Sequence, residues 1–135
     1  MNILAGPVRT TPRPTEGELE ILQVLWEHGA CTVREVHEVL HRRDGTGYTT
    51  ALKQLQIMHD KGLVQRDESQ RAHVYRAAVS KERTQKRFLA DMLRRVFDGS
   101  SSRLVLQALG DHKASREELR EIRELLDRLD EDGDR

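Results

Sequence analysis

Two adjacent threonines, Thr49 and Thr50, are followed one helical turn later by Lys53 in a stretch with helical periodicity. A threonine hydroxyl can donate to or accept from a base edge in the major groove of DNA, and the threonine methyl can contact a thymine methyl. A lysine one turn further along is placed to contact a phosphate. These residue types at this spacing favour a DNA-binding helix, provided that all three side chains face outward.

The helix that must position these side chains is expected to begin at about Tyr48 and to end at Gly62. At 100° per residue, Leu55 marks the centre of its buried face. Thr49, Thr50 and Lys53 then fall on the opposite face. The residues expected on or near the buried face are Tyr48, Ala51, Leu52, Met58 and His59.

Two further candidates flank this helix. Residues 63–66 and 72–77 are expected to form a β-hairpin, with Arg71 at the tip of the turn, where it can enter a minor groove or contact a phosphate. Thr32 is expected to cap the preceding helix, whose N-terminus offers backbone N–H groups to a phosphate. Three short helices followed by a hairpin predict a winged helix-turn-helix domain, in which the third helix lies in the major groove.

Each of these residues also has an ordinary structural interpretation. Threonines at a helix start commonly serve as caps, and exposed lysines and arginines are commonly just solvated charges. The joint order of the elements, rather than any single residue, favours DNA binding. The open alternatives are a winged helix that binds only proteins and a regulator that binds a small effector directly, without proteolytic release.

The chain is expected to divide into four parts. Residues 1–14 hold all three prolines and are expected to form a flexible arm, followed by the winged helix domain at 15–79, a helical dimerisation region at 80–130 and a flexible tail at 131–135. Capping boxes are expected where Thr15, Thr32 and Ser115 each precede a glutamate by three residues. The fold class is therefore mainly α with a small β-hairpin.

The C-terminal helices carry more apolar surface than one chain can hide, and a second copy of the chain is the expected partner. The residues expected at this homodimer interface are Phe88, Leu89, Met92, Val96, Leu104, Leu119, Ile122, Leu125, Leu126 and Leu129.

A net charge of zero hides an uneven distribution. Residues 42–80 hold seven basic and four acidic side chains, residues 81–103 hold seven and three, and residues 104–135 hold six and ten. The middle of the chain is thus basic and can attract DNA through its local field.

Several classes of protein are not expected. Cys31 is the single cysteine, the six histidines are scattered, and no hydrolase, metalloprotease or phosphate-loop motif appears. No enzyme activity, metal or cofactor is therefore expected. No long apolar run or targeting signal is present, so a soluble cytoplasmic protein without direct membrane binding is expected.

Three stretches carry a family resemblance: "ILQVLWEHGACTVREVHEVL", "GYTTALKQLQIMHDKGLVQRD" and "RAHVYRAAVSKE". They resemble the penicillinase-repressor family, the bacterial BlaI/MecI/CopY transcriptional regulators, and the resemblance covers residues 16–130. It implies a homodimeric repressor that binds a palindromic operator in double-stranded DNA. Thr49 and Thr50 match the family's base-reading positions, and Arg71 matches its wing arginine.

The resemblance also implies a way of releasing the operator. In the best-known members a membrane sensor-protease triggers cleavage at an Asn-Phe bond in the dimerisation helices. The matching position here is Gln107-Ala108, so the sequence departs from the family at the candidate cleavage region. The cysteine cluster of the copper-sensing branch is absent from the C-terminal part of the sequence, which argues against copper sensing.

Overall fold

A computed structural model describes residues 12–133 of the chain, which divide into two compact units. The first unit extends to Lys86 and the second begins at Arg87, within one helix. Residues 1–11, most of the predicted arm, and residues 134–135, the end of the predicted tail, lie outside the described residues.

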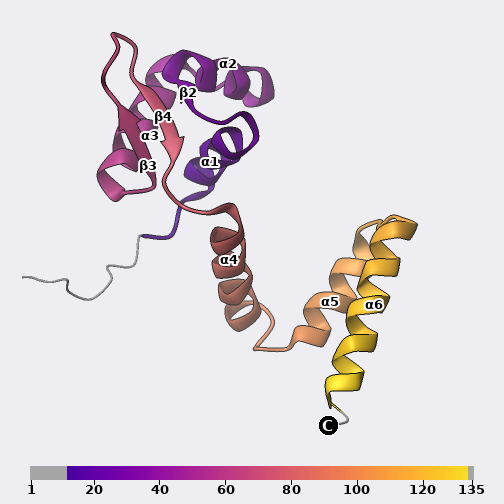
Figure 1. The fold of residues 1–135 in the computed structure, drawn as a ribbon. Helices are drawn as coiled ribbons and strands as arrows, with labels where there is room; N and C mark the ends of the chain where they lie inside the picture. The colour runs from indigo at the N-terminus through magenta and orange to yellow at the C-terminus, as the bar shows by residue number, and fades with distance from the viewer. Residues whose placement is uncertain (1–11, 134–135) are drawn as a thin grey trace, which may run out of the picture. The chain divides into compact units, whose positions relative to one another are not determined.

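The first unit is a winged helix-turn-helix domain, as the sequence predicted (Figure 1). A three-stranded antiparallel sheet in the order β2-β4-β3 accompanies three helices; β4 packs against α1, and β3 packs against α3. Its elements are α1 (Glu16–His28), β2 (Cys31–Thr32), α2 (Val33–Asp44), α3 (Tyr48–Lys61), β3 (Val64–Asp67), β4 (Val74–Ala77) and the start of α4 (Lys81–Arg95).

The sequence did not predict β2, and it placed the hairpin strands slightly differently. β2 is only two residues long and pairs with β4, where Cys31 lies opposite Tyr75 and Thr32 lies opposite Val74. A two-residue strand is too short to show an alternating pattern of apolar and polar residues. It forms because it pairs with a strand that is distant in the sequence, so the local sequence does not predict it. The hairpin strands begin at Val64 and Val74, rather than at residues 63 and 72.

Local signals define the helix ends. The predicted capping boxes of α1 and α2 are both present, with Thr15 paired with Glu18 and Thr32 paired with Glu35. α3 ends at Gly62, whose φ of 84° lies in the left-handed region that glycine adopts without strain. This sharp stop lets the chain turn directly from α3 into β3.

The hydrophobic core lies between the three helices and the sheet. Its members come from α1, α2, α3 and all three strands, including Tyr75 of β4, which is almost fully buried. The core residues are Ile21, Leu22, Val24, Leu25, Cys31, Val33, Val36, Leu40, Ala51, Leu55, Met58, Leu63, Val64 and Tyr75.

Glu18 is a buried carboxylate that joins the start of α1 to the end of α3. Its Oε1 accepts from the Thr15 N–H at 2.9 Å, and its Oε2 accepts from Lys61 Nζ at 2.8 Å. Burial tends to raise the pKa of Glu18, but hydrogen bonds from Lys61 and Thr15 outweigh burial and hold that pKa below its ordinary value. The folded domain therefore favours the charged carboxylate.

The hairpin of β3, β4 and the turn between them (residues 64–77) is the wing of the domain. The segment that follows the wing is hydrogen-bonded to α1. The Trp26 indole N–H donates to the Val79 carbonyl at 3.0 Å, just after β4. Thr84, in the first turn of α4, is buried, and its hydroxyl donates to the Ser80 carbonyl at 2.8 Å. These contacts fasten the beginning of α4 to the winged helix domain.

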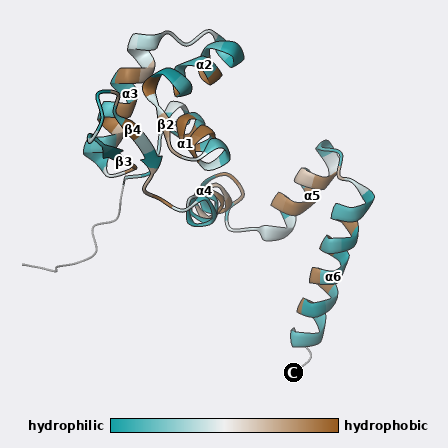
Figure 2. Cartoon of the chain, turned by 45° about the horizontal axis from the view of Figure 1, so that its top comes forward, coloured by the Kyte–Doolittle hydropathy of each residue, from teal (hydrophilic) through white to brown (hydrophobic). Residues whose placement is uncertain are grey.

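The second unit contains the rest of α4, α5 (Ser101–Asp111) and α6 (Arg116–Gly133). The predicted capping box of α6 is present, since the Glu118 N–H donates to Ser115 Oγ at 3.0 Å and the Ser115 N–H donates to Glu118 Oε1 at 2.9 Å. No side chain between residues 87 and 133 is buried within this one chain. Apolar positions recur along the hydrophilic helix α6 (Figure 2). None of the described helices is both long enough and apolar enough to cross a membrane.

We expect Glu18→Gln to lower the free energy of unfolding at pH 7 by about 1–2 kcal/mol, because it removes a charge-assisted hydrogen bond from Lys61. The depressed pKa of Glu18 means that its contribution is present above the unfolded pKa of about 4.3 and is lost as pH falls through the folded value. The difference between variant and parent should therefore shrink in acid. Urea unfolding at pH 7 and at acidic pH measures both effects.

Glu35→Gln is the matched control, because Glu35 completes the same capping box at an exposed site and has no lysine partner there. We expect it to change the free energy of unfolding by less than about 0.5 kcal/mol. Equal losses in the two variants would show that capping alone, and not the Lys61 contact, gives Glu18 its effect.

Candidate nucleic-acid interface

The first turns of α3 present Thr49, Thr50 and Lys53 to solvent, on the face opposite its buried side chains. Ala51, Leu55 and Met58 face the core and are fully buried. The core therefore fixes the rotation of α3 about its axis. The outward face predicted from the helical period is confirmed, and no side chain caps the N-terminus of α3 at Gly47.

Tyr48 differs from the prediction, which placed it on the buried face. Its side chain is 48% exposed, and its ring meets the His37 ring edge-on, with centroids 5.6 Å apart. Tyr48 is the first residue of α3, one turn before Leu52, and at that end of the helix its neighbour is the half-buried His37 of α2 rather than the core. An exposed aromatic ring therefore adjoins the two threonines.

The loop before α3 is held by local hydrogen bonds. The Thr46 N–H donates to Asp44 Oδ1 at 2.9 Å, and the Thr46 hydroxyl donates to the same oxygen. These bonds hold the pKa of Asp44 below its ordinary value. On the other side, His41 Nδ1 lies 3.3 Å from the Thr46 carbonyl oxygen. The start of α3 is thus positioned by α2.

A hollow of about 450 Å³ brings together the ends of three elements: the start of α2, the start of α3 and the end of the wing turn. Two of the predicted site residues, Thr32 and Arg71, line it. The complete lining is Thr32, Val33, Arg34, Tyr48, Leu52, Arg71, Ala72, His73 and Tyr75. Thr49, Thr50 and Lys53 are not in this lining; they lie on the exposed side of α3.

Thr32 caps α2, and both its hydroxyl and its backbone N–H are taken up by the capping box with Glu35. Its Oγ1 accepts from the Glu35 N–H at 3.2 Å, which occupies the side chain as a cap. Val33 and Arg34 are the first two residues of α2, so their N–H groups have no acceptor inside the helix. These groups and the helix dipole are suited to a phosphate.

Two arginines of the hollow, Arg34 and Arg71, form no salt bridge within the described residues, and neither does Lys53 on the exposed side of α3. Elsewhere in the same domain, Lys61 pairs with Glu18, and Arg66 Nη2 lies 3.0 Å from Glu68 Oε2. An unpaired positive charge on three neighbouring elements favours an anionic ligand such as the phosphate backbone of DNA.

Arg34 and Tyr48 line the hollow but were not predicted as site residues. Arg34 could have been predicted, because it is the second residue of a helix whose N-terminus was expected to contact a phosphate. The exposure of Tyr48 could not, because the helical period places Tyr48 on the buried face.

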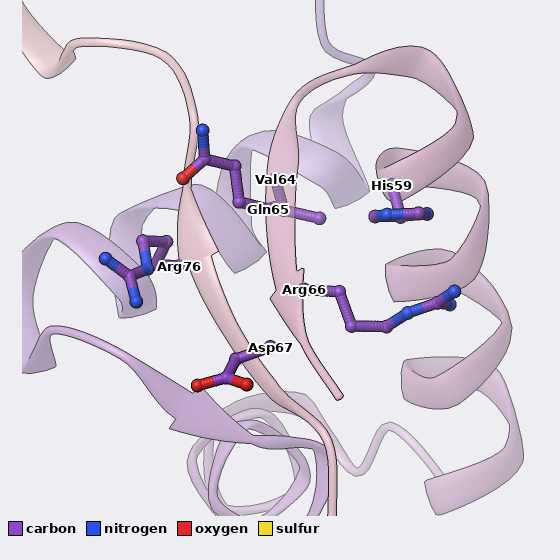
Figure 3. Close-up of a pocket in the computed structure, with 6 residues that line it drawn as sticks. All are labelled: His59, Val64, Gln65, Arg66, Asp67 and Arg76. Atoms are coloured by element: carbon purple, nitrogen blue, oxygen red, sulfur yellow. The ribbon is translucent and has the colours of Figure 1, made fainter. Parts of the chain in front are cut away.

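A second hollow, of about 500 Å³, lies along the wing, but its side chains do not converge (Figure 3). Gln65, Asp67 and Arg76 lie on one side of the strands, whereas His59 and Arg66 lie on the other. Arg66 is occupied by its hydrogen bonds with Tyr75 and Glu68, which raise its pKa. The polar side chains of this hollow therefore do not meet at one point.

The single cysteine is not activated as a nucleophile. Cys31 is buried, and both burial and the charge of Glu35 raise the pKa of its thiol, which disfavours the reactive thiolate. Between residues 12 and 133, no three or more His, Cys, Asp or Glu side chains are grouped to hold a metal ion.

The predicted interface residues of the second unit are accessible. Phe88, Leu104, Leu119 and Ile122 are half-buried, and the others are exposed. Their exposed fractions reach about half or more in Leu89, Met92, Val96, Leu125, Leu126 and Leu129. Gln107 and Ala108 are exposed within the helical backbone of α5.

Comparison with known proteins identifies relatives for nearly the whole chain. The sequence model of the family described as "Penicillinase repressor" matches residues 14–128. A curated relative, the penicillinase repressor of Bacillus licheniformis, is 23% identical over 120 residues, which cover 89% of this chain and 94% of the relative.

Solved structures of repressor domains are also similar. The solution structure of the DNA-binding domain of the repressor BlaI has 23% identity and a TM-score of 0.49, and it covers 55% of this chain and 90% of that one. Monomeric Bacillus licheniformis BlaI in complex with the blaP half-operator has 23% identity and a TM-score of 0.48, with coverages of 54% and 89%.

We expect Arg71→Ala to weaken binding to duplex DNA while leaving the melting temperature unchanged, because Arg71 is exposed and forms no salt bridge within the described residues. Fluorescence anisotropy with a labelled duplex and thermal unfolding measure the two effects. Arg76→Ala, on β4 and outside the hollow, is the control. A fall in melting temperature of several degrees would instead identify Arg71 as a structural residue.

Proposed function

The chain belongs to the penicillinase repressor family, and we propose that it is a homodimeric transcriptional repressor that binds a palindromic operator in double-stranded DNA. One observation carries the proposal: Thr49 and Thr50 are exposed at the start of α3, and Tyr48, the residue before them, lines a hollow with Arg34 and Arg71, which form no salt bridge among the described residues. In this proposal the threonines read bases, and the two arginines bind phosphates nearby.

In this proposal the exposed start of α3 enters the major groove. The hydroxyls of Thr49 and Thr50 contact base edges and give sequence specificity, because each base pair presents its own pattern of donors and acceptors there. Lys53, further along the same face, contacts a phosphate. The contact adds affinity without specificity.

The neighbouring elements fix the register of the domain on the duplex. The N–H groups at the start of α2, together with Arg34, bind one phosphate. Arg71 of the wing contacts a second phosphate or enters the minor groove. Arg34 on α2 and Arg71 on the wing turn would let the domain follow the backbone while α3 stays in the groove.

The proposed dimerisation through the second unit is supported by the exposed apolar surface of that unit. α6 carries a stripe in which Leu125, Leu126 and Leu129 are about half exposed, and no side chain from 87 to 133 is buried in one chain. Covering such a stripe is favourable by about 25 cal/mol per Å² of apolar area. A second copy provides a matching stripe, and this is the proposed interface.

A dimer also explains how a small domain obtains high affinity. Two recognition helices held by one dimer bind two half-sites of a palindrome, so the second contact forms at high effective concentration. Each half-site contact can then be weak while the pair is tight.

Release from the operator is proposed to follow cleavage in α5, with a membrane sensor-protease as the partner. The candidate bond, Gln107–Ala108, is exposed, and α5 buries none of its side chains in the single chain. A helix with so little packing opens locally at low cost, which a protease requires. Cleavage there would cut α6 away from the DNA-binding domain.

We expect Thr50→Ala to weaken binding to a selected operator by about 1–3 kcal/mol while barely affecting a random duplex, because base contacts carry the sequence information. Lys53→Ala should weaken both duplexes alike and reduce the slope of log affinity against log salt by about one. Operators selected from a random-sequence pool, followed by salt titrations, measure both quantities.

Gln56→Ala is the control, since Gln56 is exposed on the same helix two turns beyond the threonines. An unchanged ratio of operator to random affinity in Thr50→Ala would mean that α3 does not read the sequence. A salt slope of zero in the parent protein would favour a winged helix that binds proteins instead.

We expect Ile122→Glu combined with Leu125→Glu to convert the dimer to a monomer and to reduce palindrome affinity toward that of a single half-site, because both charges would be buried in the interface. Sedimentation equilibrium and an operator titration measure the two effects. Arg120→Ala with Asp127→Ala, on the polar face of α6, is the control. A monomeric variant that bound the palindrome as tightly as the parent would contradict the dimer model of repression.

A further inference from the structure

Two histidines lie one turn apart on α2, beside the loop that leads into α3. The rings of His37 and His41 have centroids 5.3 Å apart and are tilted by 44°. His41 is exposed and His37 is half-buried, so solvent reaches the pair. This histidine pair plays no part in the proposed contacts with bases or phosphates.

The hydrogen bond of His41 prepares its other nitrogen to bind a metal. His41 Nδ1 lies 3.3 Å from the Thr46 carbonyl oxygen, which can only accept, so Nδ1 carries the proton. In the neutral ring the lone pair is then on Nε2. Histidines that bind metals almost always donate their second ring N–H to a carbonyl or a carboxylate in this way.

The separation of the rings suits one shared ion. Two imidazoles bound to one tetrahedral zinc, with Zn–N distances of about 2.0–2.1 Å, have centroids roughly 5 Å apart. The observed centroid separation of 5.3 Å matches this requirement. Two protein ligands leave further positions for water.

The charges around the pair are mixed. On α2, Arg34 and Arg42 repel a cation, whereas Glu38 attracts one, and the side chain of Arg42 is turned to the Glu38 carbonyl, 3.2 Å from its Nε. From the neighbouring segment, Asp44 adds a second carboxylate and Tyr48 brings an uncharged ring. No strong positive field therefore excludes a divalent ion.

We propose that His37 and His41 form a binding site for a divalent transition metal ion of the imidazole-preferring class, with Zn²⁺ as the probe. Neutral imidazole suits zinc, copper and nickel, whereas magnesium and calcium prefer oxygen ligands. The site does not use Cys31, which is buried and whose thiol donates to the Gly29 carbonyl at 3.3 Å.

The ion would act on the start of the recognition helix, and this second step rests on the proposed function. His41 contacts the Thr46 carbonyl, and the His37 ring meets Tyr48, so both ligands touch the segment that begins α3. An ion that locks the two rings also locks this segment in position. Preorganising Thr49 and Thr50 in this way strengthens operator binding by reducing the ordering cost.

Isothermal titration of the metal-free full chain with Zn²⁺, in the absence of DNA, tests the site directly. We expect one ion per chain, and a loss of affinity of about a hundredfold in His37→Asn and in His41→Asn, because a single imidazole lacks the chelate advantage. His112→Asn, which removes an exposed histidine of the second unit, should bind Zn²⁺ like the parent. Circular dichroism checks that each variant is folded.

Unchanged Zn²⁺ affinity in folded His37→Asn and His41→Asn would overturn the site. A second titration, with a selected operator, should show tighter binding with Zn²⁺ in the parent and no zinc effect in the two variants. Zinc binding at the pair without any change in operator affinity would overturn the regulatory step alone. Failure of the metal-free chain to bind any duplex would count against the proposed function and leave the zinc result standing.

Discussion

The buried carboxylate of Glu18 is the contact on which the geometry of the DNA-facing domain depends. One of its oxygens accepts from Thr15 and so begins α1, and the other accepts from Lys61 at the end of α3. The same group that caps one helix therefore anchors the far end of another. Removing Glu18 would leave Lys61, which is about one-third exposed, without this partner and would remove the polar link between the start of α1 and the end of α3. A buried ion pair gives little net stability, but the two oxygens of Glu18 connect the start of α1 directly to the end of α3.

With its far end anchored, the exposed end of α3 is determined by two further constraints. Ala51, Leu55 and Met58 set the rotation of the helix, and the contact of His41 with the Thr46 carbonyl holds the loop before its N-terminus against α2. The threonines thus take their position from contacts that they do not make themselves. The wing is fixed separately, through the pairing of β4 with both other strands and through the bond from Trp26 to Val79.

The features that could be predicted from the sequence are local ones. Capping boxes at Thr15, Thr32 and Ser115 are present because cap and partner lie three residues apart, within one helical turn. The outward face of α3 follows from its period for the same reason. The hydrogen bond from Lys61 to Glu18 joins residues that are 43 positions apart, so no local sequence pattern predicts it. The strand β2 forms only by pairing with the distant β4, and no local pattern predicts it either. The contact between the rings of His37 and Tyr48 depends on how α2 packs against α3, which the sequence does not show. The spacing of His37 from His41, one helical turn, was visible in the sequence.

Amide chemical-shift mapping of the isotope-labelled full chain, titrated with a duplex selected from a random-sequence pool, tests the central claim most directly. The claim is that the start of α3, the start of α2 and the wing turn form one DNA-binding surface. We predict that the largest shifts occur at Thr49 and Thr50, at Arg34 and at Arg71. Shifts confined to the outer face of the wing at Gln65 and Arg76, or to α5 and α6, would contradict it.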